Sequence, residues 1–89
     1  MHASKKHYDE LASMFYRLFG EASFELPEAE KTLIDDLLEH TEYGVAYDVL
    51  IDALREHKIP LTEDDFRKIR AIGELMNLDT ESLNEFVSG

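Results

Sequence analysis

The sequence predicts an all-α fold, arranged as a single compact domain of four to five helices. Apolar residues recur along most of the chain at steps of three and four, which is the period of a helix with one buried face. No segment of useful length alternates apolar and polar residues as a strand does. The length of 89 residues suits one core. We therefore expect residues 1–89 to form one helical domain.

The first helix is expected at residues 5–19, and Gly20 is expected to end it in a left-handed conformation. Its apolar positions are Tyr8, Leu11, Phe15, Leu18, Phe19 and Ala22. A second helix should follow the connection at residues 21–26, with Pro27 in its first turn. Its predicted buried residues are Leu33, Ile34, Leu37 and Leu38.

The third helix should begin after Thr41, a plausible N-cap, and stop ahead of Pro60. On a helical wheel its predicted core face holds Tyr43, Ala46, Tyr47, Leu50, Ala53, Leu54 and His57. The segments 33–40 and 50–57 agree at six of eight positions, and each ends in histidine. Two amphipathic helices can match by accident, so the agreement does not establish a duplication.

The start of the fourth helix is the best specified. Thr62 should be its N-cap with Asp65 at the third helical position, and Leu61 and Phe66 occupy the positions of a hydrophobic staple. Its apolar residues continue through Ile69, Ile72, Leu75 and Met76 to Asn77, a suitable residue beyond the C-cap. A short fifth helix is expected at residues 80–87, burying Leu83 and Phe86.

The charge of the chain is strongly negative and unevenly distributed. Twenty acidic residues against nine basic ones give a net charge of −11. Residues 21–65 hold fourteen of the acids against only Lys31, Arg55 and Lys58. Nucleic acids and anionic membrane surfaces are therefore disfavoured as partners.

Other composition features narrow the class of protein further. The absence of cysteine excludes disulfides, zinc–thiolate sites and thiol catalysis, and it fits a reducing compartment. No apolar run is long enough for a membrane span, and no secretory signal is readable after Met1. We expect a cytoplasmic protein without a membrane partner.

The titratable residues do not predict catalysis. His2 and His7 lie near the N-terminus, whereas His40 and His57 each close a helix, where the helix dipole favours a protonated imidazole. Neighbouring acids such as Asp35 and Asp36 lie about 100° apart around a helix and do not converge across a cleft. No phosphate loop, calcium loop or nucleophile elbow is present. We expect no enzymatic activity, no metal and no cofactor.

The acidic, helical composition also resembles that of acyl carrier proteins, which carry a prosthetic arm on the serine of an Asp-Ser-Leu motif. The nearest match is Glu81-Ser82-Leu83, which lacks the aspartate and lies too near the C-terminus for helices to follow. An acidic helical carrier or adaptor protein remains the alternative from another class.

The far side of the third helix carries the candidate binding residues. Asp48, Asp52 and Glu56 share this side with two apolar residues, Val45 and Val49. Another element, such as the fifth helix or the N-terminal arm, could cover the valines. Otherwise the side is an acidic protein-binding face with an apolar centre, suited to a basic partner. The candidate partner-binding residues are Glu42, Val45, Asp48, Val49, Asp52 and Glu56.

The segment from Leu37 to Asp79 carries a family resemblance. Its residues are Glu42-Tyr43-Gly44, then Ala46, Leu50 and Leu54, then Ile59-Pro60-Leu61-Thr62. In these it resembles the MafI family of bacterial immunity proteins, in which a glycine commonly stands where this chain has Thr41.

The resemblance implies a non-catalytic cytosolic protein that binds and neutralises a toxin domain encoded beside it, in Maf or contact-dependent inhibition systems. The expected partner is the C-terminal domain of the cognate toxin. Toxins paired with this family are often nucleases, including EndoU-like RNases. A nuclease presents basic residues to phosphate, which agrees with the acidic face inferred from the helical wheel.

Overall fold

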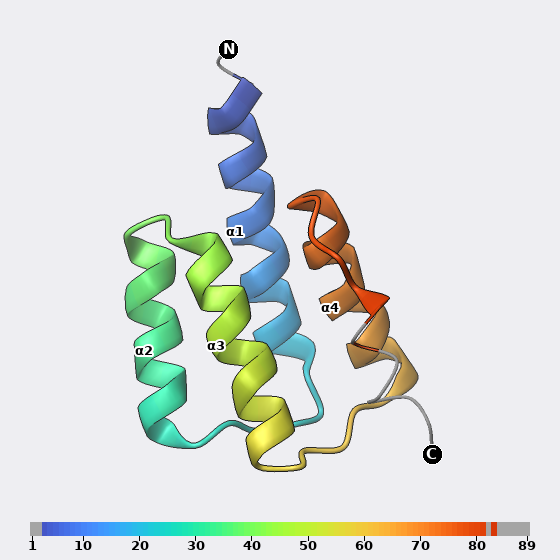
Figure 1. The fold of residues 1–89 in the computed structure, drawn as a ribbon. Helices are drawn as coiled ribbons and strands as arrows, with labels where there is room; N and C mark the ends of the chain where they lie inside the picture. Colours follow the sequence, from blue (N-terminus) through green and yellow to red (C-terminus); the bar gives the residue numbers. More distant parts are fainter. Residues whose placement is uncertain (1–2, 82, 84–89) are drawn as a thin grey trace. The chain divides into compact units, whose positions relative to one another are not determined.

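The computed structural model of the chain describes residues 3–81 and 83. Four helices follow one another through this part of the chain, which contains no strand (Figure 1). They are α1 (Ala3–Glu21), α2 (Glu28–Glu39), α3 (Tyr43–Glu56) and α4 (Glu63–Leu75). The prediction of an all-α fold is confirmed.

Of the expected fifth helix, Ser82 and residues 84–87, Phe86 among them, lie outside the described residues. Between them, the Leu83 N–H donates to the carbonyl of Thr80 at 3.1 Å, and Leu83 is buried as predicted.

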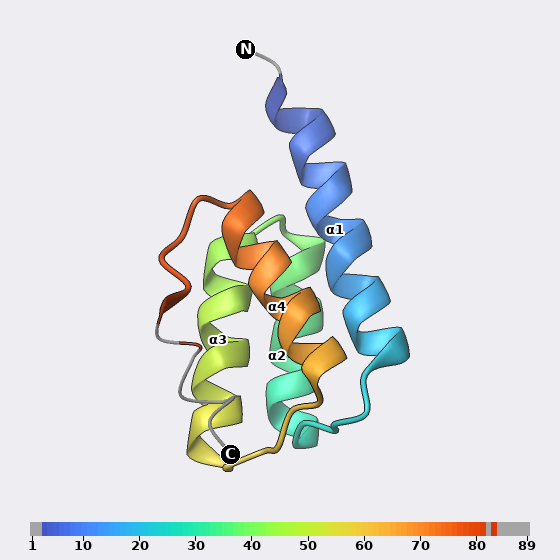
Figure 2. The same cartoon turned by 90° about the vertical axis from the view of Figure 1, so that its right-hand side faces the viewer.

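The described helices fall into two units, each built from one pair. One unit joins α1 and α4, which are distant in the sequence, and the other, residues 24–60, joins the consecutive helices α2 and α3. The partners in each pair run antiparallel, as Figures 1 and 2 show. The expectation of a single domain stays a prediction.

The α2–α3 unit buries most of the residues that the helical periodicity indicates. All six apolar residues predicted for the core face of α3 are buried, together with Ile51, and Ile34 and Leu38 face inward from α2. The predictions for Leu33 and His57 are wrong, because both are exposed. Leu33 lies about 120° around the helix from the centre of the Ile34–Leu38 stripe, and His57 comes after the last helical residue of α3.

The α1–α4 unit buries Leu11, Phe15 and Leu18 of α1 and Ile69 and Ile72 of α4. Tyr8, predicted as part of the same buried stripe, is 45% exposed, so that assignment is wrong. Helix α1 has 19 residues and α4 has 13, and Figures 1 and 2 show the first turns of α1 extending beyond the end of α4. Tyr8 lies in the first two turns of α1.

The end of α1 differs from the prediction. Gly20 lies inside the helix, and no described glycine has a positive φ. The helix continues to Glu21, whose carboxylate lies 3.6 Å from Arg17 and 3.1 Å from Lys68 of α4. The helix thus includes two more residues at this end, Gly20 and Glu21, than the prediction gave it, and these ion pairs favour the extension.

The other three helices end in the same cap, and in each the residue beyond the C-cap is left-handed without being glycine. These residues are Thr41 (φ 56°), Lys58 (φ 50°) and Asn77 (φ 62°). In each cap the next N–H reaches back to a carbonyl inside the helix: Glu42 to Leu37 at 2.8 Å, Ile59 to Leu54 at 3.0 Å and Leu78 to Gly73 at 2.9 Å. These bonds form Schellman motifs, which satisfy carbonyls that the helix leaves open.

The helix boundaries confirm two further predictions and correct two. Thr62 and Asp65 form the predicted capping box at α4, and Asn77 occupies its predicted place beyond the C-cap. Thr41 is not the N-cap of α3, because its backbone ends α2 and Glu42 takes the N-cap position. Pro27 is the N-cap residue of α2 and lies one position before its first turn.

Candidate functional site

The acidic face of α3 is the first candidate site, and we use this name for Glu42, Val45, Asp48, Val49, Asp52 and Glu56. All four carboxylates are exposed, Val45 is 47% exposed and Val49 is half-buried. The sequence left open that another element covers the two valines. In the described part of the chain Val45 is not covered in this way, whereas Val49 is partly covered.

The helical geometry places Val45 on the midline of this face, toward its N-terminal end. At about 100° per residue the six positions span an arc of about 120°, with the valine in the middle and the carboxylates on both sides. Arg55 borders the arc, and its Nη1 lies 3.7 Å from Oδ1 of Asp52. Both side chains are well exposed, so this ion pair holds Asp52 only weakly.

A second cluster lies where α3 ends. Nε2 of His57 is 3.4 Å from Oε2 of Glu30 in the first turn of α2. One carboxylate oxygen of Glu56 lies within 4.8 Å of a ring nitrogen of His57 and of a carboxylate oxygen of Glu30. The antiparallel pairing of α2 and α3 brings these residues together across a sequence separation of 27. Helical periodicity alone does not indicate Glu30, although the antiparallel pairing of two consecutive helices places it at the same end as His57.

His40 closes α2 as His57 closes α3, which confirms both residues as C-caps. The surroundings of His40 are different: its Nδ1 donates to the backbone carbonyl of Asp36 at 2.8 Å and lies 3.8 Å from the carboxylate of Asp36. This hydrogen bond, and then the Asp36 charge, raise the pKa of His40 above its ordinary value. The imidazole is therefore held by its own helix.

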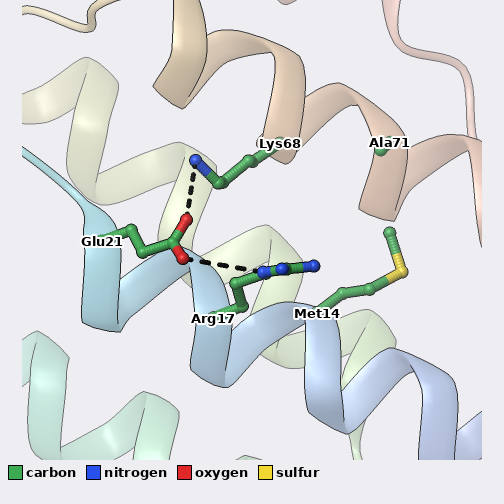
Figure 3. A pocket seen from close by; sticks show the side chains of 5 residues that line it. All are labelled: Met14, Arg17, Glu21, Lys68 and Ala71. Atoms are coloured by element: carbon green, nitrogen blue, oxygen red, sulfur yellow. Dashed lines mark ion pairs between the residues drawn. The ribbon is translucent and has the colours of Figure 1, made fainter.

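A pocket of about 330 Å³ opens in the α1–α4 unit (Figure 3). Its lining residues are Met14, Arg17, Glu21, Lys68 and Ala71. The cations of Arg17 and Lys68 both face the Glu21 carboxylate, and Lys68 also pairs with Asp64. Hydrogen bonds to Asp64 and then Glu21 raise the pKa of Lys68. Because carboxylates already neutralise its cations, the pocket offers little excess charge to an ionic ligand.

Asp65 is the strongly buried carboxylate of the described chain, with 2% of its surface exposed. Its Oδ2 accepts from the Ser23 hydroxyl at 2.7 Å and from the Thr62 N–H at 3.3 Å. These bonds tie the segment after α1 to the start of α4. Asp65 is thus used in holding the fold.

Comparison with known proteins gave no matching family model, no matching curated protein and no matching solved structure. The resemblance to the MafI family therefore rests on the residues quoted for it. None of the described helices is long and apolar enough to cross a membrane.

Proposed function

We propose that the chain is a non-enzymatic immunity protein that binds and neutralises a cognate toxin domain, a basic nuclease, through the acidic face of α3. The observation that carries the proposal is the half-exposed Val45, which lies on the midline of the arc formed by four exposed carboxylates. Val45 lies in the first turn of α3, where an exposed β-branched residue contributes neither solubility nor good helix propensity. At an interface it supplies the apolar centre that a ring of charges needs.

Charge gives the proposed partner its chemistry. Residues 24–60 hold ten acidic residues against three basic ones, a net charge of −7. A nuclease must present cations to the phosphates of its substrate, so its binding cleft complements such a surface. Complementary charges accelerate the encounter, and burial of the apolar centre slows dissociation.

The backbone at Thr41 lends further support to the resemblance. Its φ of 56° lies in the region that glycine occupies without steric cost, and glycine is the residue that MafI proteins commonly have at this position. A family pattern with glycine here fits the cap that this chain forms between α2 and α3.

The test is co-expression with the adjacent toxin gene product, followed by binding kinetics on the purified pair. We expect the chain to rescue growth. Asp48→Lys combined with Asp52→Lys should lower the association rate and flatten its salt dependence, because exposed charges are screened beyond about 8 Å at physiological ionic strength. Val45→Asp should mainly raise the dissociation rate, because it puts a charge where water must be excluded.

The matched control is Asp35→Lys combined with Asp36→Lys on α2, an equal change of charge at two exposed residues of the same unit. It should alter the association rate less than the α3 pair does. Equal effects of the two double substitutions on the association rate would show that the toxin is attracted by net charge alone. A larger effect of the α2 substitutions would place the interface at Asp35, Asp36 and Glu39. Failure to rescue growth would contradict the function itself. A prosthetic group found in the intact mass would favour the carrier alternative.

A further inference from the structure

We propose that Glu30, Glu56 and His57 form a binding site for a divalent transition-metal ion of the zinc type, at the end of the α2–α3 pair. The three side chains offer one imidazole nitrogen and two carboxylate oxygens, all within 4.8 Å of one another. The inference does not rest on the proposed function, although Glu56 belongs to both sites, and it departs from the sequence expectation that the chain holds no metal.

The spacing of the ligand atoms suits a small tetrahedral ion. Bonds of about 2.0–2.1 Å at the tetrahedral angle place neighbouring ligand atoms about 3.3–3.4 Å apart. Nε2 of His57 and Oε2 of Glu30 are 3.4 Å apart, although they lie on different helices. Glu56 is exposed, so rotation of its side chain can bring a carboxylate oxygen into the third position.

The donor set selects the class of metal. An imidazole together with carboxylates is a ligand set of zinc sites, whereas calcium and magnesium prefer six or more oxygens. Three protein ligands leave the fourth tetrahedral position to water. Two carboxylates in a unit of net charge −7 also attract a dication over a distance.

The backbone holds the ligands in place. His57 is the C-cap of α3, fixed by the Ile59-to-Leu54 hydrogen bond of its Schellman motif, and Glu30 lies in the first turn of α2. The antiparallel pair is joined by residues 40–42 at its other end (Figure 1). A metal bound here would join α2 and α3 at the end where no short connection does so.

His40 provides the internal comparison. It closes α2 with the same cap geometry and ends the matching eight-residue segment, yet it belongs to no group of three potential ligands in the described chain. The two histidines therefore differ in the carboxylates that approach from another helix. They form a matched pair for mutation.

The experiment titrates Zn²⁺ into the full chain after treatment with a chelator, by isothermal calorimetry and by thermal unfolding. We expect one ion to bind and to raise the unfolding temperature, and a chelator to reverse the rise. His57→Gln and Glu30→Gln should each lower the affinity at least about tenfold, since loss of a ligand should cost no less than the loss of an outer-shell partner. His40→Gln should leave the affinity unchanged.

Absence of binding at millimolar Zn²⁺ would overturn the proposal. So would binding that survives in His57→Gln and Glu30→Gln, because the ion would then occupy other ligands, such as His2 or His7. Circular dichroism of each variant confirms that the helices are intact before titration. Since no toxin takes part, failure here leaves the immunity function untouched, and failure of the toxin assay leaves the metal site untouched.

Discussion

Asp65 shows how a single side chain can fix a helix start. Its carboxylate accepts from Ser23 and Thr62, while its own N–H donates to the Thr62 hydroxyl at 3.0 Å. Burial alone would raise the pKa of Asp65, but the hydrogen bonds from Ser23 and Thr62 outweigh it and lower the pKa below its usual value. The charged form is therefore the one that stabilises the fold.

This sign predicts the pH dependence. A depressed pKa contributes stability that is fully present above the unfolded value of about 3.9 and is lost as the pH falls through the folded value below it. Asp65→Asn should cost about 1–2 kcal/mol at neutral pH and should flatten the loss of stability below about pH 4. Urea unfolding measured from pH 2 to pH 7 checks both effects.

The exposed neighbour Asp64 supplies the control, because Asp64→Asn removes only a surface ion pair with Lys68, worth at most about 1 kcal/mol. Equal pH profiles for the two variants would contradict the role assigned to Asp65.

Residue by residue, the sequence predicted the contacts that are local in the chain. The Thr62–Asp65 box and the left-handed Asn77 depend on neighbours within a few positions, and both are confirmed. Ser23 and Asp65 are separated by 42 residues, and Glu30 and His57 by 27, so pattern alone does not join them. Such pairs follow from how helices pack, which periodicity does not specify.

Among the elements, the three matched caps place L-residues where glycine is favoured. A left-handed backbone costs an ordinary residue roughly 1–2 kcal/mol, and asparagine bears it best. Thr41 is β-branched and is the least suited of the three to its φ. The chain forms these caps because each satisfies helix carbonyls that would otherwise lack a partner.

Thr41→Gly should therefore stabilise the fold by about 0.5–1 kcal/mol, the steric relief being partly offset by the greater freedom of glycine when unfolded. Asn77→Gly should change stability by much less. Thr41→Ala keeps Cβ and loses the exposed hydroxyl bond to the carbonyl of His40, so it should bring no such gain. Equilibrium urea unfolding, with the m-value unchanged between variants, compares the stability of the three. If Thr41→Ala stabilises the fold as much as Thr41→Gly does, relief of the left-handed backbone is not the cause.

The element boundaries show where propensity misled. Glycine was expected to end α1, but ion pairs of Glu21 with Arg17 and Lys68 lie beyond Gly20. Threonine was expected to begin α3, but the Glu42-to-Leu37 hydrogen bond assigns Thr41 to the end of α2. In both places the helix boundary departs from the statistical preference of the residue.

The whole chain raises the question of cooperativity. Leu50 and Ile69 are fully buried, one in the α2–α3 unit and one in the α1–α4 unit. If residues 1–89 form the single domain that the sequence predicts, the chain should unfold in one transition. Leu50→Ala and Ile69→Ala should then each lower the free energy of that unfolding by about 2–5 kcal/mol. Far-UV circular dichroism and calorimetry should then report one coincident transition.

Leu33→Ala is the matched control, because Leu33 lies on α2 with 46% of its surface exposed and should change stability little. Two separate transitions, each shifted by only one of the core variants, would show that the units unfold independently.

For the molecule as a whole, the sequence predicted the helical class and the exposure of the α3 carboxylates, because charge and periodicity are properties of the chain itself. It left open whether Val45 and Val49 were covered, and the structure answers differently for the two, with Val45 exposed and Val49 half-buried. Coverage depends on which elements pack over a residue, which one helix does not encode.

In the sequence the α2–α3 pair lies between α1 and α4, and this order determines when each pair can form during synthesis. Helices α2 and α3 are consecutive, so their antiparallel pair can close as soon as both have left the ribosome. Helix α1 emerges first, but its antiparallel partner α4 is the last described helix to be made. Synthesis adds about 5–20 residues per second, so α4 is completed roughly 3–10 s after α1. Until then the apolar residues Leu11, Phe15 and Leu18 have no partner helix. During that interval the nascent chain presents a helix with an unfilled face, the kind of surface that chaperones bind.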